Sequence, residues 1–369
     1  MRPNRPRHRA RRSSPGLAST LAMGMIVLAL LVFAGYIVLK GRSSPKQSNS
    51  TLPATTTSAA SPEASTSTTD AVTTTTAAQL KEASPLYAVS SSTVTLSEPG
   101  KYLCAPYGSS TGCIVRSMPL YIYYPVAGKP GDVVNDAAPI HQGGPFPLVI
   151  FGNGYLEPVG SYSVILDYWA SRGYIVAAPQ FPLSQSDSVG GPWEADILSQ
   201  PSDMSAAATF MLNQNQARSS KFFGLIKTSE IAAIGQSDGA DDALALGYNT
   251  CCRDTRIKAV VSLSGAELGS YPGRYFVVAG PPLLVVQGTA DEINEPSDSQ
   301  KVFAAARPPK YFETLIGADH MDGYQANDPY SDTLRVVTGS FLDYYLKGES
   351  GALKTMSIAG NVAGVASLS

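Results

Sequence analysis

From residue 85 onward, short apolar runs alternate with longer segments in which apolar residues recur at helical spacing. Strands are expected at residues 87–96, 120–124, 147–151, 174–178, 231–234, 257–263, 283–287 and 311–316, the last of these being the final strand. Helices are expected at residues 162–172, 203–215, 238–247, 297–306 and 331–346. Strands joined by helices of this length favour right-handed crossovers. We therefore predict one α/β domain at residues 85–369, with a mainly parallel sheet covered by helices on both faces.

The first 42 residues have a different pattern, in which a basic segment precedes an uncharged apolar one. Residues 1–16 contain six arginines, and residues 17–39 carry no charge before Lys40 and Arg42. A helix of that length, at about 1.5 Å per residue, is roughly 35 Å long and can cross a bilayer. We predict a basic cytoplasmic tail at 1–16 and a transmembrane signal anchor at 17–39. A cleaved signal peptide is the alternative, although its apolar region is normally shorter.

Residues 40–84 are dominated by Ser, Thr, Pro and Ala and contain almost no large apolar side chain. Such a segment cannot bury enough apolar surface to form a core, so we predict a disordered linker. Placed after a membrane anchor, this linker would tether an extracytoplasmic domain to the cell membrane by a single pass.

Charge is distributed unevenly along the 369 residues, although the formal net charge is only -2. Residues 1–42 hold eight of the 27 Lys and Arg and no acidic residue, so the rest of the chain is acidic. An acidic surface repels phosphate backbones, and we therefore expect no nucleic-acid partner. The 44% content of hydrophobic residues excludes a wholly disordered chain.

The cysteines are consistent with export to an oxidising compartment. Cys104 and Cys113 flank a loop rich in Gly and Ser, and we predict a disulfide between them. Cys251 and Cys252 are adjacent, and a vicinal disulfide, a free thiol and a bridge elsewhere are all open at this point. Only three histidines are present to complete a cysteine site, so we predict no bound metal.

The strongest chemical signal is Gly235-Gln236-Ser237-Asp238-Gly239, which follows the expected strand at 231–234 and precedes a helix. It matches G-x-S-x-G in the strand-turn-helix context that lifts a serine hydroxyl out of a sheet. The small residues on either side let the strand and the helix approach closely. The amide of Asp238 lies at the helix start, where the dipole favours a developing oxyanion.

A serine nucleophile needs a base, and the base needs an acid that holds its tautomer. Both are expected at later strand ends, in the order serine, acid, histidine. The strand at 283–287 runs into Asp291, and the strand at 311–316 runs into His320. We predict that Asp291 is the acid and His320 the base. The competing acids are Glu267, Glu292 and Glu295.

The second oxyanion donor is expected in the loop after the strand at 147–151. Two glycines there allow the backbone to turn its amides toward the site. We predict the amide of Tyr155 as the donor, with Asn153 as the second candidate. Residues 182–201, which contain Trp193, either border the substrate cleft or form a surface loop.

Residues 120–346 resemble the α/β-hydrolases. Among these they are similar to the compact serine esterases related to dienelactone hydrolases, polyester and cutin hydrolases, plant chlorophyllases and platelet-activating-factor acetylhydrolases. The likeness lies in the segments PLVIFGNGYLEP, YWASRGYIVAAPQFP, QPSDMSAAATFML, IGQSDGA, VQGTADE and GADHMD. It implies the α/β-hydrolase fold, a triad of Ser237, Asp291 and His320, and an oxyanion hole made by the amides of Tyr155 and Asp238.

Two positions depart from these relatives. Gln236 stands where many of them have His, and Asn153 stands where a His-Gly dipeptide is frequent. We place both side chains in the substrate cleft with Trp193. Neither departure affects the nucleophile, the base or a backbone donor, so the resemblance predicts the activity but not the substrate preference.

The expected function is extracytoplasmic hydrolysis of a carboxylic ester, in a small molecule, a lipid or a polymer, without any cofactor. Acyl transfer or peptide cleavage by the same triad is one alternative. The other is a non-catalytic surface-binding domain on a hydrolase fold, because a fold does not by itself establish an activity.

Overall fold

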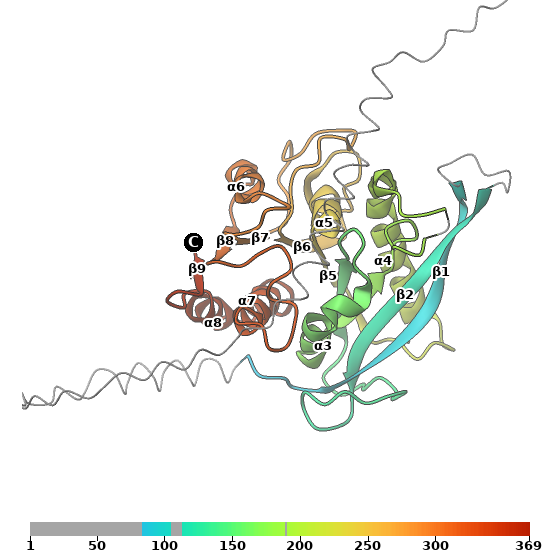
Figure 1. The fold of residues 1–369 in the computed structure, drawn as a ribbon. Helices are drawn as coiled ribbons and strands as arrows, with labels where there is room; N and C mark the ends of the chain where they lie inside the picture. Colours follow the sequence, from blue (N-terminus) through green and yellow to red (C-terminus); the bar gives the residue numbers. More distant parts are fainter. Residues whose placement is uncertain (1–82, 105–112, 189) are drawn as a thin grey trace, which may run out of the picture. The chain divides into compact units, whose positions relative to one another are not determined.

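The computed structural model describes residues 83–104, 113–188 and 190–369, which form a nine-stranded sheet with helices on both faces (Figure 1). The strands are β1 (Ala88–Cys104), β2 (Cys113–Val126), β3 (Phe146–Gly152), β4 (Ile175–Pro179), β5 (Ile226–Gln236), β6 (Ile257–Leu263), β7 (Leu283–Gly288), β8 (Lys310–Leu315) and β9 (Ala366–Leu368). They lie in the order β1-β2-β4-β3-β5-β6-β7-β8-β9.

The centre of the sheet is parallel and its two margins are antiparallel. Strands β4, β3, β5, β6, β7 and β8 pair in parallel, whereas β1 with β2, β2 with β4, and β8 with β9 pair antiparallel. The carboxyl ends of parallel strands meet at one edge of a sheet. The loops that follow β3, β5, β7 and β8 therefore open at a common edge.

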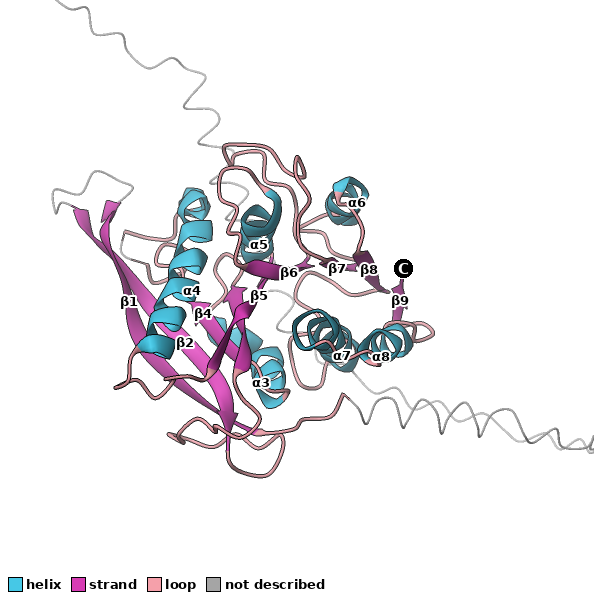
Figure 2. Cartoon of the chain, turned by 180° about the vertical axis from the view of Figure 1, so that it is seen from behind, coloured by secondary structure: helices cyan, strands magenta, loops and turns pink. Residues whose placement is uncertain are grey.

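The helices form a layer on each face of the sheet (Figure 2). One layer contains α4 (Gln200–Gln216), α5 (Asp238–Tyr248) and α6 (Pro296–Ala305), and the other contains α3 (Ser163–Ser171), α7 (Ser331–Leu342) and α8 (Ala352–Ala359). Short 3-10 turns η1 (Val159–Tyr162) and η2 (Glu194–Ser199) follow β3 and β4, and a π-helical turn η3 (Asp343–Lys347) extends α7. Because both faces are covered, β3, β4 and β7 are buried along their whole length.

The prediction of an α/β sheet with helices on both faces is confirmed. Two elements near the carboxyl terminus, α8 and β9, were not predicted. The strand at 311–316 was expected to be the last, and this is wrong because β9 pairs antiparallel with β8 beyond it. Helix α8 also lies outside the predicted elements. Three residues of strand are too few for an apolar alternation to be recognised.

One carboxyl group lies inside the apolar core. Glu313 of β8 is 0% exposed, and neither of its carboxyl oxygens has a hydrogen-bond partner among the described residues. Tyr311, two residues earlier on the strand, packs its ring against Phe341 of α7, so Glu313 faces the same helical layer. Burial raises the pKa of Glu313 well above its usual range.

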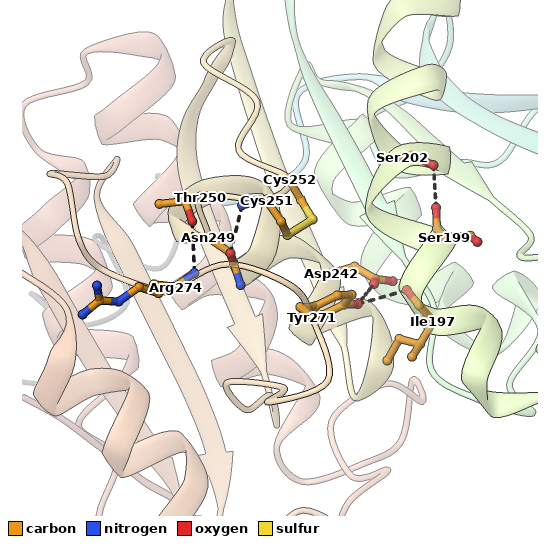
Figure 3. Close-up of a disulfide and its surroundings, with 10 residues drawn as sticks. All are labelled: Ile197, Ser199, Ser202, Asp242, Asn249, Thr250, Cys251, Cys252, Tyr271 and Arg274. Atoms are coloured by element: carbon orange, nitrogen blue, oxygen red, sulfur yellow. Dashed lines mark hydrogen bonds between the residues drawn. A yellow bond between two sulfur atoms is a disulfide. The ribbon is translucent and has the colours of Figure 1, made fainter.

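The four cysteines lie in two pairs. Cys104 and Cys113 are opposite each other in the register of β1 and β2, and their disulfide stays a prediction. The sulfur atoms of Cys251 and Cys252 are bonded at 2.07 Å, which answers the question left open for this pair (Figure 3). The Asn249 side chain accepts a 3.0 Å hydrogen bond from the Cys251 amide in the same turn, directly after α5.

The predicted tail, the anchor at 17–39 and the linker up to residue 82 lie outside the described residues. No helix in the described ranges has the length and apolar character needed to cross a bilayer. The transmembrane anchor and the linker therefore stay predictions.

Candidate active site

Ser237 occupies the sharp turn between β5 and α5. Its backbone has φ 55° and ψ -125°, a conformation that residues with a side chain rarely adopt. The Ser237 carbonyl accepts hydrogen bonds from the amides of Ala240 (2.8 Å) and Asp241 (3.1 Å), which fixes the first turn of the helix. The turn thus has the strained strand-to-helix geometry that presents a serine hydroxyl at a sheet edge.

Three glycines make this turn possible. A methyl group added to Gly235 would lie 1.9 Å from the Gly239 carbonyl oxygen, and one added to Gly239 would lie 2.1 Å from the Gly152 carbonyl oxygen. Real side-chain carbons do not come that close to backbone atoms. The strand before the serine, the helix after it and the end of β3 therefore pack directly through backbone atoms.

Gly235→Ala is expected to destabilise the domain, because its methyl group would overlap the backbone of α5. Overpacking of this kind typically costs about 1–3 kcal/mol. Urea unfolding measures the change in the free energy of unfolding. Gly269→Ala is the matched control, since nothing lies within 4 Å of the added carbon. Equal stability of the two variants would contradict the close packing at Gly235.

The predicted base and acid are hydrogen-bonded to each other. His320 Nδ1 lies 2.8 Å from Asp291 Oδ2. His320 is 8% exposed and Asp291 is 4% exposed, so the pair is shielded from water. The three competing acids, Glu267, Glu292 and Glu295, are all exposed. The structure therefore joins His320 to Asp291, the acid that the sequence favoured.

Asp291 is held in its ionised form by its neighbours. Burial acts to raise the pKa of Asp291, but the hydrogen bond and charge of His320 outweigh it and the pKa is lowered. The amides of Ile293 (3.0 Å) and Asn294 (2.9 Å) donate to its Oδ1, and the Gln287 side chain donates to its Oδ2 at 3.0 Å. An ionised acceptor at Nδ1 orients the imidazole and leaves Nε2 as the basic nitrogen.

The residues on either side of Ser237 interact with His320. The Gln236 side-chain nitrogen lies 3.2 Å from His320 Nε2 and 3.1 Å from the His320 carbonyl oxygen. His320 also acts to lower the pKa of the Asp238 carboxyl. Among the described residues, no hydrogen bond joins Ser237 Oγ to the imidazole. Catalytic hydrogen bonds of this type are often long without substrate and tighten in the reacting complex.

The loop after β3 lies against the serine. A carbon added to Gly154 would be 3.2 Å from Ser237 Cβ and 2.6 Å from Gln236 Oε1. The Gly154 amide donates to the Tyr162 hydroxyl at 3.2 Å. Tyr155, the predicted oxyanion donor, is the next residue of this loop and is partly exposed. Its amide is thus brought to the neighbourhood of the predicted nucleophile.

Asn153 and Gln236 do not line an open cleft as we expected. Both side chains are 0% exposed. The Asn153 amide group donates to the carbonyls of Gly154 (3.0 Å) and Glu157 (2.9 Å), so it closes the loop after β3 on itself. Gln236 points into the protein, where it contacts His320. Asn153 directly follows β3 and Gln236 ends β5. Both strands are buried here, so the two side chains are enclosed by the core.

Tyr162 belongs to the site but is absent from the sequence prediction. Its hydroxyl donates to Gln236 Oε1 at 2.7 Å and accepts from the Gly154 amide. The ring packs edge-on against Tyr324, with the centroids 5.3 Å apart. The apolar pattern marks Tyr162 only as the first residue of a helix, and no motif indicates its role.

Asp238 places a titratable group directly after the predicted nucleophile. Burial raises the pKa of Asp238 to about 7, the charge of Glu194 acts in the same direction, and His320 opposes them. Its backbone amide lies in the first turn of α5, where amides have no acceptor within the helix. The predicted oxyanion donor is therefore available at a helix start.

The segment after β4 runs along the loop after β3. The Leu156 amide donates to the Ser184 carbonyl at 2.7 Å, and the Gln185 side chain reaches the Glu157 carbonyl at 3.3 Å. Trp193, which we expected at the substrate cleft, lies in this segment and is 39% exposed. The segment borders the loop after β3, and the place of Trp193 in a cleft stays a prediction.

Turn η2, at the end of this segment, is connected by hydrogen bonds to helix α5. The Tyr271 hydroxyl is hydrogen-bonded to the Ile197 carbonyl of η2 (3.1 Å) and to the Asp242 carboxyl of α5 (Figure 3). Burial raises the pKa of Asp242 well above its usual range. A single phenol thus connects η2 to the helix that begins after Ser237.

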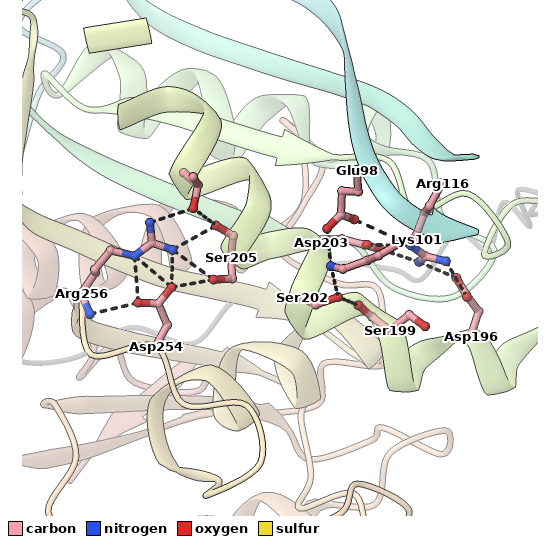
Figure 4. A network of polar contacts seen from close by, with 11 residues as sticks. Glu98, Lys101, Arg116, Asp196, Ser199, Ser202, Asp203, Ser205, Asp254 and Arg256 are labelled. Carbon is pink, nitrogen blue, oxygen red and sulfur yellow. Dashed lines mark hydrogen bonds and ion pairs between the residues drawn. The ribbon is translucent and has the colours of Figure 1, made fainter. Parts of the chain in front are cut away.

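The same turn is also fixed from the β1–β2 hairpin by a buried arginine (Figure 4). Arg116 of β2 donates two 2.8 Å hydrogen bonds to Asp196 of η2. It also pairs with Asp203 of α4, with one bond of 2.7 Å, and lies 4.0 Å from Glu98 of β1. Arg116 is 3% exposed. Its removal would leave buried carboxylates without a counter-ion.

A hollow of about 420 Å³ adjoins the loop that carries the predicted base, His320. Its wall includes Glu157 and Val164 from the segment after β3, and Met321 and Tyr324 from the loop after His320. Met321 directly follows His320 in the sequence. This side of the site therefore offers a partly apolar surface with one carboxylate. In the described ranges, no three or more His, Cys, Asp or Glu side chains are grouped to hold a metal ion.

This geometry can be compared with known proteins. Residues 129–267 match the chlorophyllase family model. That family is of the α/β-hydrolase type, so the match confirms the predicted resemblance to α/β-hydrolase esterases and supports a hydrolase of α/β fold. The chlorophyllase match includes Ser237 and ends before Asp291 and His320. No curated protein matches the chain.

Proposed function

We propose that the protein is a serine hydrolase that cleaves carboxylic esters, with Ser237 as nucleophile, His320 as base and Asp291 as its acid. The observation that carries this proposal is the 2.8 Å hydrogen bond between His320 and Asp291 beside the strained turn of Ser237. The chlorophyllase match supports the hydrolase class.

In the proposed reaction, His320 Nε2 takes the proton of the Ser237 hydroxyl while Ser237 Oγ forms a bond to the ester carbonyl carbon. The amides of Tyr155 and Asp238 donate to the oxyanion. The imidazolium then gives its proton to the leaving alcohol oxygen, and the C–O bond to that alcohol breaks. Water repeats these steps on the acyl-enzyme and releases the acid. Asp291 stays ionised throughout and stabilises the imidazolium.

The substrate and location are part of the same proposal. The hollow beside Met321 and Tyr324 would hold the part of a small-molecule, lipid or polymer ester that lies toward His320. The anchor at 17–39 and the linker would hold the domain outside the cytoplasm at the membrane. The bond between Cys251 and Cys252 supports an oxidising compartment, and the register of Cys104 and Cys113 supports the predicted second bridge.

A fluorophosphonate probe tests the reaction class directly. We expect the full-length protein to be labelled on Ser237, with the site identified by mass spectrometry of its peptides. Aryl esters of short and long acyl groups then establish the acyl preference, and added alcohols or peptides reveal transfer or peptide cleavage. If the folded protein is not labelled, the esterase proposal fails and a non-catalytic binding domain is favoured.

A further inference from the structure

A buried chain of hydrogen bonds connects the loop after β3 to the imidazole. The Gly154 amide donates to the Tyr162 hydroxyl (3.2 Å), which donates to Gln236 Oε1 (2.7 Å). The Gln236 nitrogen then lies 3.2 Å from His320 Nε2 and 3.1 Å from the His320 carbonyl oxygen. Tyr162 and Gln236 are both 0% exposed, so water does not compete for these groups.

The partners determine which way the Gln236 amide faces. The His320 carbonyl oxygen can only accept a hydrogen bond, so the NH₂ group of Gln236 must lie on that side. The Tyr162 hydroxyl accepts from Gly154 and therefore gives its own proton to Gln236 Oε1. The second N–H of Gln236 consequently points at His320 Nε2. That nitrogen must present its lone pair, while Nδ1–H donates to Asp291.

We propose that Gln236 is a positioning residue for His320, which holds the neutral imidazole by its Nε2 lone pair and releases the ring once Nε2 is protonated. The inference rests on the proposed function. In the resting site, the amide of Gln236 engages the atom that must accept the serine proton.

The interaction between the Gln236 N–H and His320 Nε2 changes from attractive to repulsive during the reaction. When the Ser237 O–H bond breaks and an Nε2–H bond forms, the amide N–H faces a second N–H and the attraction becomes a repulsion. The protonated ring is then favoured to turn away from Gln236 and toward the leaving oxygen, which receives the proton. The Nδ1–H bond to Asp291 persists as the pivot of this movement.

The charges around His320 act alongside this contact. Asp291 binds Nδ1 from the loop after β7, and the carboxyl of Asp238, at the start of α5, interacts electrostatically with His320. Tyr162 of η1 and Tyr324 of the loop after β8 are neutral phenols whose pKa values burial raises. On the loop of His320 itself, Asp319 and Asp322 accept hydrogen bonds from backbone amides. A substitution at Gln236 changes none of these side chains, although Gln236→Met removes the acceptor of the Tyr162 hydroxyl.

The test is the rate of fluorophosphonate labelling of the full-length protein against pH, for Gln236→Met and Gln236→Glu. Methionine removes the donor that disfavours the imidazolium, so the acid limb of the profile should move to higher pH by about half to one unit. Glutamate can accept from Nε2–H and retain the protonated ring, so the shift should exceed that of methionine. Tyr162→Phe, which frees Gln236 Oε1, should shift the limb in the same direction by less.

Gln200→Met is the matched control, because Gln200 is also 0% exposed and donates to Ser184 Oγ at 2.7 Å. Its acid limb should coincide with that of the unmodified protein. A merely structural role of Gln236 would lower the rate equally at every pH. Identical midpoints in the unmodified protein, Gln236→Met and Gln236→Glu would overturn the inference and leave the esterase proposal intact.

Imidazole ¹⁵N spectra of the full-length protein give a second readout that does not depend on labelling. His320 should be the Nδ1–H tautomer with a hydrogen-bonded Nε2, and in Gln236→Met the Nε2 signal should move toward that of a free lone pair. An unchanged Nε2 signal would contradict the contact. If the protein is not labelled at all, the esterase proposal fails, while these spectra still decide whether Gln236 holds the ring.

Discussion

Replacing Ser237 with alanine should lower kcat/KM for an activated aryl ester by about 10⁴- to 10⁶-fold. The variant lacks the oxygen that forms the acyl-enzyme, and only binding and the oxyanion donors remain to assist water. The hydrolysis rate and fluorophosphonate labelling should be lost together, with the far-ultraviolet circular dichroism unchanged.

Ser264→Ala provides a matched control for this prediction. Ser264 lies at the end of the neighbouring strand β6, has φ 54° and is 5% exposed, so it resembles Ser237 in conformation and burial. Among the described residues, no hydrogen bond joins Ser264 to a histidine, and its variant should keep its activity within a few-fold of the unmodified protein. Full activity of Ser237→Ala, or equal losses in both variants, would refute the assignment of the nucleophile.

Glu313→Met should raise the free energy of unfolding, and the gain should grow with pH. The native state raises the pKa of Glu313, so it binds the proton more tightly than the unfolded chain does. Above the ordinary carboxyl pKa of about 4.5, the unfolded chain releases this proton while the native state keeps it, and the native state loses stability. The loss is about 1.4 kcal/mol per pH unit until the raised native pKa is reached.

Urea unfolding at about pH 5, 6 and 7 measures this difference. Glu292→Met is the control, because Glu292 is exposed and its substitution should leave the pH dependence unchanged. Methionine has a similar length to glutamate and adds no buried polar atom. Parallel curves of stability against pH for the unmodified protein and Glu313→Met would contradict a buried, protonated Glu313.

Apolar periodicity predicts the central strands well because both faces of the sheet are covered. Strand β3 and the first four residues of β7 are uninterrupted apolar runs, and the predicted bounds of both strands differ from the observed ones by at most one residue. Apolar periodicity is a weaker guide for the outer strands of the sheet. Strands β1 and β2 are 17 and 14 residues long, far longer than predicted, because exposed polar residues interrupt their apolar pattern. Strand β9 depends on pairing with β8, which local sequence does not encode.

In the site too, features that depend on neighbouring residues could be predicted, whereas contacts between residues far apart in the sequence could not. Ser237, Asp291 and His320 each follow a recognisable strand, so their common edge could be predicted from the order of the elements. The hydrogen bond of Tyr162 to Gln236 joins residues 74 positions apart, and only the packing of η1 under the sheet edge creates it. The burial of Asn153 and Gln236 likewise results from tertiary packing. The sequence does not show this packing, so we predicted both side chains in a cleft.

The arginine that holds η2 has a consequence for engineering. Arg116 binds Asp196 in η2 and Asp203 in α4, so the segment after β4 is fastened to the opposite hairpin rather than only to its own ends. Grafting a foreign loop between residues 182 and 199 to alter selectivity would remove two hydrogen bonds of this guanidinium unless the acceptor at position 196 is retained. Libraries for redesign should therefore vary the exposed residues of the segment and keep Asp196.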